Sequence, residues 1–142
     1  MRHIIGVYVV VAALLIPCLA AGAQPLLVAV ASDDPESTSP VSNVAAFSQY
    51  YLLFSSLNMV QVLRNPFLDK GPGAGPLVVE YLAEKGVGTL IAGRFGPPMI
   101  DAMDRKGMRY FQFSGIVAQD AVERVVNYLK PADRGGGGKP GD

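Results

Sequence analysis

The chain has 142 residues, and its 12 Lys and Arg residues balance 12 Asp and Glu residues. A chain of zero net charge without an evident basic face is not expected to bind nucleic acid, since neutralising phosphates supplies most of that affinity. Half of the residues are hydrophobic, which is enough for one domain with a real core.

The N-terminus, residues 1–23, is typical of a cleavable export signal. A positive start is followed by an apolar run at residues 4–16, a break at Pro17 and small residues at 21–23. The run is shorter than the roughly 20 residues that span a bilayer. We therefore expect cleavage after Ala23 and a periplasmic or secreted protein, with an uncleaved anchor as the alternative and as the protein's sole link to the membrane.

Export would change the chemistry that the protein can offer. The single histidine and the single cysteine, His3 and Cys18, both lie in the predicted signal. Lipid attachment at Cys18 is disfavoured because the bulky Ile16 and Pro17 precede it. The exported domain is thus expected to contain neither imidazole nor thiol.

The first half of the exported chain predicts strands. Residues 26–31 form a short apolar run, which is typical of a buried strand. The polar residues 32–43 then predict a long surface loop, a kind of segment that is often functional. Residues 50–56 and 59–63 are predicted to form a hairpin, and a helix over residues 45–57 is the alternative.

The second half predicts helices that alternate with strands. Glycine and proline at residues 70–76 indicate a loop, and residues 131–142 are too rich in glycine to order themselves. Between this loop and the tail, the pattern predicts three helices and two strands. The first helix includes residues 77–82 and stops at Gly86, and the second runs from Pro97 or Pro98 to Lys106. The two strands are predicted at residues 89–92 and 109–113, and the third helix at 118–129.

This order predicts an α/β domain with three layers, α/β/α, around a mixed sheet of about five strands, one of them antiparallel. Right-handed crossovers should bring the loops that follow the parallel strands to one edge of the sheet. Open α/β sheets bind their ligands at that edge. The loops after Ala31, Ala92 and Phe113 are therefore expected to converge.

Five short motifs give the chain a recognisable resemblance, and they lie at residues 28–32, 39–42, 65–66, 73–75 and 93–97. Together they resemble the dinitrogenase iron–molybdenum cofactor biosynthesis domain, the NifX/NifB-type carriers. The resemblance defines a domain at residues 24–130. It implies a ribonuclease-H-like fold and non-catalytic binding of an iron–sulfur or molybdenum-containing cluster, although the residues themselves identify no cofactor.

One segment departs from the family pattern. Many members carry a His-Phe-Gly triplet after the Ser-Pro-Val-Ser motif, and its histidine is a proposed cluster ligand. Here residues 43–47 read Asn-Val-Ala-Ala-Phe. Soft metal clusters are held mainly through thiolate or imidazole, so we expect an altered or lost anionic metal ligand.

Three glycine-containing turns precede predicted helices, at residues 71–75, 93–96 and 114–115. Unpaired N–H groups and the helix dipole there could hold a phosphate, an oxoanion or a thiometalate, with ordinary turn geometry as the alternative. Arg94 is the strongest single candidate because guanidinium recognises oxoanions through paired hydrogen bonds; a solvated loop arginine is the alternative. The predicted ligand-binding residues are Ser32, Ser39, Ser42, Asn43, Gly73, Gly75, Gly93, Arg94, Gly96, Ser114 and Gly115.

Two other groups of residues are interpreted as structural. The acidic residues 33, 34 and 36 fit no cation-binding loop and favour a solvated surface. Met99 and Met103 are spaced as a core stripe, which is favoured over a copper site that would also use Met108.

No catalytic residue or metal ligand is predicted, because the exported chain lacks histidine, cysteine and a nucleophile elbow. A hydrolase that uses carboxylates such as Asp33 ranks last. The favoured hypothesis is an exported, non-catalytic protein that binds an anionic metal species. The alternative is a cofactor-free module that binds another protein of the cell envelope.

Overall fold

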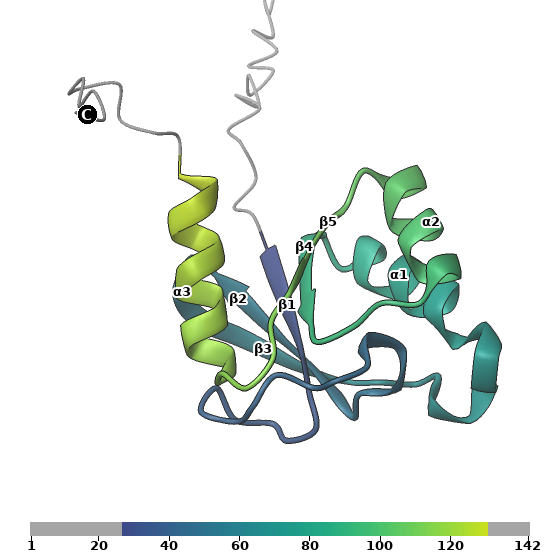
Figure 1. Ribbon diagram of the computed structural model, residues 1–142, viewed down its shortest axis with the longest axis horizontal. Helices are drawn as coiled ribbons and strands as arrows, with labels where there is room; N and C mark the ends of the chain where they lie inside the picture. The colour runs from purple at the N-terminus through teal and green to yellow at the C-terminus, as the bar shows by residue number, and fades with distance from the viewer. Residues whose placement is uncertain (1–26, 131–142) are drawn as a thin grey trace, which may run out of the picture.

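The computed structural model describes residues 27–130, and these form one five-stranded sheet between two layers of helices (Figure 1). The strands are β1 (Leu27–Ser32), β2 (Tyr50–Ser55), β3 (Asn58–Arg64), β4 (Val87–Ala92) and β5 (Arg109–Gln112). The helices are α1 (Ala74–Glu84), α2 (Pro97–Lys106) and α3 (Ala118–Leu129), with short 3-10 segments η1 (Ala45–Phe47) and η2 (Leu68–Gly73). The predicted export signal and glycine-rich tail lie outside the described residues.

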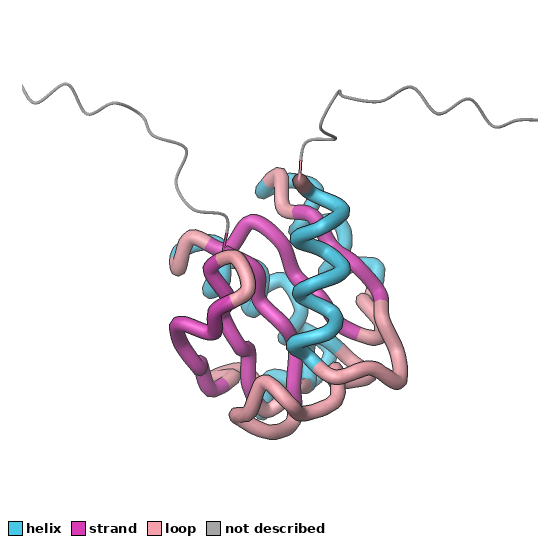
Figure 2. The backbone as a smooth tube through the Cα atoms, turned by 90° about the vertical axis from the view of Figure 1, so that its left-hand side faces the viewer, coloured by secondary structure: helices cyan, strands magenta, loops and turns pink. Residues whose placement is uncertain are grey.

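The sheet is mixed, as the sequence predicts. Its strand order is β3-β2-β1-β4-β5. Strand β4 runs parallel to both β1 and β5, whereas β2 pairs in antiparallel fashion with β1 and with β3. Strand β2 is therefore the one strand that runs against the other four. In Figure 2 the loops that follow the parallel strands gather at the lower end of the sheet.

Hydrophobic residues cover both faces of the sheet, because helices pack on both faces and bury its central strands. Along β1, Ala29 and Ala31 pack towards α1 and α2, while Val28 and Val30 pack towards α3. The larger cluster includes the side chains of Leu82 and other residues of α1 and α2, and the smaller one is built on α3. This arrangement confirms the predicted α/β/α layers.

The β2–β3 hairpin is present, so the alternative helix over residues 45–57 is wrong. The turn occupies Ser56 and Leu57, with Ser56 at a φ of 54°, and β3 starts at Asn58 rather than Met59. The pairing of β2 with β3 shifts its register between Leu53 and Phe54. No helix among residues 27–130 is long and apolar enough to cross a membrane.

Helix α1 begins earlier than predicted, at Ala74. Gly75 and Pro76 therefore belong to its first turn and not to the preceding loop. Proline is tolerated there because an N–H group in the first turn has no partner within the helix. The glycine-proline loop is consequently shorter than the sequence suggests.

Candidate anion-binding site at the ends of the parallel strands

The segment after β1 crosses the ends of the parallel strands and is hydrogen-bonded to both sides. The N–H of Ser42 donates to the carbonyl of Ala31 at 2.8 Å, and the N–H of Gly93 donates to the carbonyl of Ser42 at 2.8 Å. Next along the chain, the N–H of Ala45 donates to the carbonyl of Arg94 at 3.0 Å. The chain at residues 42–45 is thus inserted between the ends of β1 and β4.

Gly93 makes this crossing possible. A Cβ atom at this position would lie 2.9 Å from both the Cα and the carbonyl oxygen of Asn43. Carbon atoms in contact are normally about 3.5–4.0 Å apart, so only glycine fits without a backbone shift. The predicted glycine at 93 therefore has a packing role that the sequence did not reveal.

The loop after β5 joins the same edge of the sheet. The N–H of Phe113 donates to the carbonyl of Ala92 at 3.1 Å, and the N–H of Val41 donates to the carbonyl of Ile116 at 3.0 Å. The three loops after β1, β4 and β5 therefore converge, as the topology predicts.

Their convergence forms a polar hollow, which we define by its lining residues Asn43, Gly93, Arg94 and Ser114. Its volume is about 410 Å³, and Asn43, Arg94 and Ser114 are exposed to solvent. Among residues 27–130, the guanidinium of Arg94 forms no ion pair. Nor does any main-chain carbonyl of these residues accept a hydrogen bond from the N–H of Asn43, Arg94 or Ser114. The polar hollow thus presents several hydrogen-bond donors and one positive charge.

Three of the four predicted serines, Ser32, Ser39 and Ser42, do not line the polar hollow. Ser32 is fully buried; its hydroxyl donates to the carbonyl of Asp34 at 2.8 Å and accepts from the N–H of Asp34 at 3.3 Å. The hydroxyl of Ser42 donates to Oδ1 of Asp33 at 3.3 Å. Ser39 is also buried. The hydroxyls of Ser32 and Ser42 thus satisfy groups within the long polar loop itself and do not point to a ligand.

Gly73 and Gly75 also lie outside the polar hollow. Gly73 is the residue before α1, and Gly75 is buried inside its first turn. A Cβ at Gly75 would lie 3.0 Å from Cβ of Met99, so this glycine lets α1 approach α2 closely.

The start of α2 offers fewer donors than expected. Pro97 and Pro98 occupy its first two positions and have no N–H groups. The next two N–H groups, of Met99 and Ile100, both donate to the carbonyl of Gly96 at 3.0 Å. The first turn of α2 therefore offers no free N–H group to an anion, and anion binding at Gly96 remains a prediction that depends on the N–H of Gly96 and on the helix dipole.

The start of α3 is similarly occupied. This helix begins at Ala118, so the turn at Ser114 and Gly115 does not open it directly. The N–H of Ala118 donates to the carbonyl of Ser39 at 2.8 Å, and that of Gln119 to the carbonyl of Ser37 at 2.9 Å. Ser114 reaches the polar hollow as a loop residue, and Gly115, at a φ of 72°, serves the turn.

A buried hydrogen-bond network fixes η1, the segment that follows Asn43 of the polar hollow. The hydroxyl of Tyr51 donates to the carbonyl of Ala45 at 2.7 Å. Nδ2 of Asn65 donates to the carbonyls of Ala46 and Ser48, both at 3.0 Å. Burial raises the pKa of Tyr51 far above its usual value, so the hydroxyl remains a donor at physiological pH. Asn65 belongs to the Asn-Pro motif, whose structural role is to hold η1.

The acidic residues after β1 and the methionines of α2 lie where a structural interpretation expects them. The acidic side chains at 33, 34 and 36 are exposed, and residues 27–130 contain no group of three His, Cys, Asp or Glu placed to hold a metal ion. Met99 and Met103 are buried in the core with exposures of 1% and 0%. The two methionines thus form a core stripe, and the three acidic residues lie on the surface.

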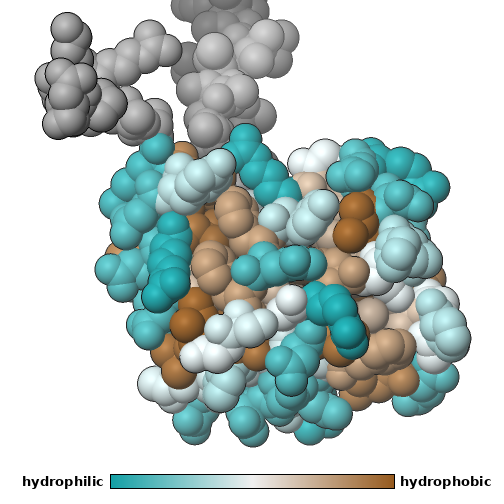
Figure 3. Space-filling model, viewed as in Figure 1, coloured by the Kyte–Doolittle hydropathy of each residue, from teal (hydrophilic) through white to brown (hydrophobic). Residues whose placement is uncertain are grey.

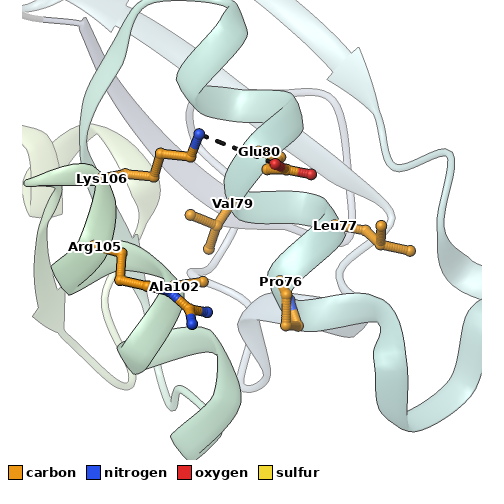
Figure 4. A pocket seen from close by; sticks show the side chains of 7 residues that line it. All are labelled: Pro76, Leu77, Val79, Glu80, Ala102, Arg105 and Lys106. Atoms are coloured by element: carbon orange, nitrogen blue, oxygen red, sulfur yellow. Dashed lines mark ion pairs between the residues drawn. The ribbon is translucent and has the colours of Figure 1, made fainter.

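A second hollow lies between α1 and α2, away from the strand ends (Figure 4). It has a volume of about 470 Å³ and is lined by Leu77, Ala102, Arg105 and neighbouring residues. Glu80, its acidic residue, pairs with Lys106, whose Nζ lies 4.0 Å from Oε1 of Glu80. Because Arg105 lines this second hollow and not the polar hollow, it provides a control position for experiments on Arg94.

Comparisons with known proteins point to one family and one fold. The family model described as "Dinitrogenase iron-molybdenum cofactor" matches residues 24–128. The apo form of the orange protein from Desulfovibrio gigas superposes with a TM-score of 0.69 at 22% identity, over 74% of this chain and 90% of that one. A candidate NifB protein from Thermotoga, assigned to the DUF35 family, gives a TM-score of 0.62 at 28% identity, over 72% and 88%. None of the functionally curated proteins matches the chain.

Proposed function

Because the chain belongs to the dinitrogenase iron–molybdenum cofactor family, we propose that it is an exported, non-catalytic carrier whose cargo is an anionic metal species bound in the polar hollow. The family match supports a metallocluster-binding role. The observation that carries the proposal is the guanidinium of Arg94, which is free of ion pairs within residues 27–130 and lies where three loops converge. Guanidinium binds oxoanions through two parallel hydrogen bonds.

The donor set decides how such a cargo is held. The residues that line the polar hollow carry a guanidinium, an amide, a hydroxyl and main-chain N–H groups, and residues 27–130 contain neither histidine nor cysteine. Direct ligation of a soft metal by thiolate or imidazole does not fit these residues. An anion whose own oxo or sulfido ligands face the protein does fit, because each donor can bond to such a ligand.

Binding of molybdate, tungstate and tetrathiomolybdate, measured by calorimetry, tests the proposal. Arg94→Ala is expected to weaken uptake at least tenfold, and Arg94→Lys to recover part of it because the charge returns without the paired donors. Arg105→Ala is the matched control and should leave uptake unchanged. Equal affinity in Arg94→Ala and the unmodified protein would place the site elsewhere.

Export is part of the same proposal. It rests on the N-terminal pattern, whose removal takes away His3 and Cys18. Intact-mass measurement of the secreted protein should give the mass of a chain that starts at Gln24. A mass that still includes residues 1–23 would return an imidazole and a thiol to the protein and reopen direct metal ligation.

One observation favours a second function, binding to another envelope protein. Strand β3 is an edge of the sheet, and four large hydrophobic side chains on its hairpin are exposed: Leu57 (41%), Met59 (40%), Val60 (57%) and Val62 (37%). An open edge of this kind accepts an extended segment of a partner. This function predicts a metal-free protein whose β3 amides gain protection from deuterium exchange when the partner binds. Val60→Lys should abolish both partner binding and this protection.

A further inference from the structure

An apolar cavity lies directly beside the polar hollow. It has a volume of about 130 Å³, and no charged residue lines it. Three chain segments that are distant in sequence enclose it: η1, the start of α1 and the start of α2. Its lining includes Val44, Ala46, Phe47, Gly75, Pro98 and Met99.

The polar hollow and the apolar cavity share one wall. Asn43 lines the hollow while the next residue, Val44, lines the cavity; likewise Arg94 lines the hollow and Gly96 the cavity. The hydrogen bond from Ala45 to the carbonyl of Arg94 ties the two segments together at this wall. The two linings therefore adjoin along residues 43–44 and 94–96, and a ligand that occupied both sites would have to reach across this wall.

The size and chemistry of the cavity specify a small apolar group. An apolar cavity of about 150 Å³ stays dry and takes up benzene, so one of about 130 Å³ suits a single ring or a branched alkyl group. Its rim is accessible, because Phe47 is 47% exposed. In Figure 3 hydrophobic surface shows between hydrophilic groups at the lower right, the region that η1 and the loop into α2 occupy in Figure 1.

The cavity is held open by the fold and need not be formed by the ligand. Its η1 wall is fixed by the hydrogen bonds of Tyr51 and Asn65. Its opposite wall is fixed where Gly75 meets Met99. A pre-formed site loses little entropy when it binds a ligand.

From this juxtaposition we infer that the polar hollow and the apolar cavity are two subsites for one small organic anion, whose charged group binds Arg94 and whose ring-sized apolar group enters the cavity. The inference rests on the proposed function, because the anionic subsite is the same. It adds a second class of ligand, a small organic anion with an apolar group, which the donors of the polar hollow alone do not specify.

A matched pair of phosphate monoesters tests this inference on the unmodified protein. Phenyl phosphate and methyl phosphate carry the same anionic group and differ in the apolar one. Phenyl phosphate is expected to bind at least tenfold more tightly, and its ring protons should show nuclear Overhauser contacts to the methyl groups of Val44 and Met99. Equal affinities, or ring contacts elsewhere, would overturn the inference.

Two variants separate the subsites. Ala46→Leu adds bulk at the cavity wall and should remove the preference for phenyl phosphate while methyl phosphate binds as before. Arg94→Ala should weaken both esters by the same factor. The comparison of the two esters on the unmodified protein tests the inference without any variant. The inference can therefore be refuted even if Ala46→Leu does not fold.

The outcomes distinguish this inference from the proposed function. Molybdate binding without a preference for phenyl phosphate overturns the two-subsite inference and leaves the carrier function in place. Preference for phenyl phosphate without molybdate binding supports the two subsites and overturns the carriage of inorganic anions. No binding of any of these anions overturns both.

Discussion

Replacing Gly93 with alanine tests the crossing of the two segments at the strand ends. The new Cβ would lie 2.9 Å from main-chain atoms of Asn43, so the backbone itself must move. Movement strains the two hydrogen bonds that flank the contact, from Gly93 to Ser42 and from Ala45 to Arg94. Overpacking costs about 1–3 kcal/mol and each of the two strained hydrogen bonds up to about 1 kcal/mol, so we expect a loss of about 1–5 kcal/mol in the free energy of unfolding.

Urea unfolding of the two variants Gly93→Ala and Gly96→Ala measures this effect. Gly96 is the control because the nearest atom to its Cβ would be Cδ of Pro98 at 3.9 Å, an ordinary contact. Its replacement should cost less than about 1 kcal/mol. If both variants unfold at the same urea concentration as the unmodified protein, the segments do not cross as closely as described.

The remaining predictions concern the network behind the wall and the core. Tyr51→Phe removes the hydrogen bond to Ala45 and should cost about 1 kcal/mol at pH 7. Because burial raises the pKa of Tyr51, the folded state keeps its proton where the unfolded state loses it; stability should therefore fall as the pH rises above about 10, and less steeply in Tyr51→Phe. Asn65→Asp replaces a donor that faces two carbonyls with a buried carboxylate, so we expect a loss of about 3–5 kcal/mol at pH 7, and a smaller loss at pH 4, where the acid is protonated. Met103→Ala should cost about 2–5 kcal/mol in thermal or urea unfolding without changing anion affinity; a change would connect this methionine with the ligand.

Much of the architecture could be predicted from the sequence because it depends on local pattern and chain order. The apolar runs of the central strands and the helical spacing around Val78 and Val125 indicate the elements. The alternation of strands and helices then determines which loops meet. These rules are sufficient to bring Asn43, Arg94 and Ser114 to one edge of the sheet.

The rest of the site depends on contacts that no local pattern encodes. The serines at 32, 39 and 42 have the right chemistry for a ligand, but the fold uses them inside the loop. The sequence predicts Gly75 in a loop, because the start of a helix depends on a few competing interactions in its first turn. In the fold Gly75 lies in the first turn of α1 and packs closely on Met99. The apolar cavity joins three distant segments and leaves no signature in the sequence.

The two prolines at the start of α2 carry information beyond helix initiation. Pro97 and Pro98 are good starts for a helix. The same two residues remove the N–H groups that an anion would need. A helix that begins with two prolines is thus a poor main-chain anion site, and this shifts the expected binding energy to the side chain of Arg94.

The most direct test of the carrier function is elemental analysis of the untagged protein purified from its native host. We predict that molybdenum, tungsten or iron co-elutes with the secreted protein and is lost in Arg94→Ala but retained in Arg105→Ala. A secreted protein that is free of metal, or that keeps its metal without Arg94, would contradict the proposed function.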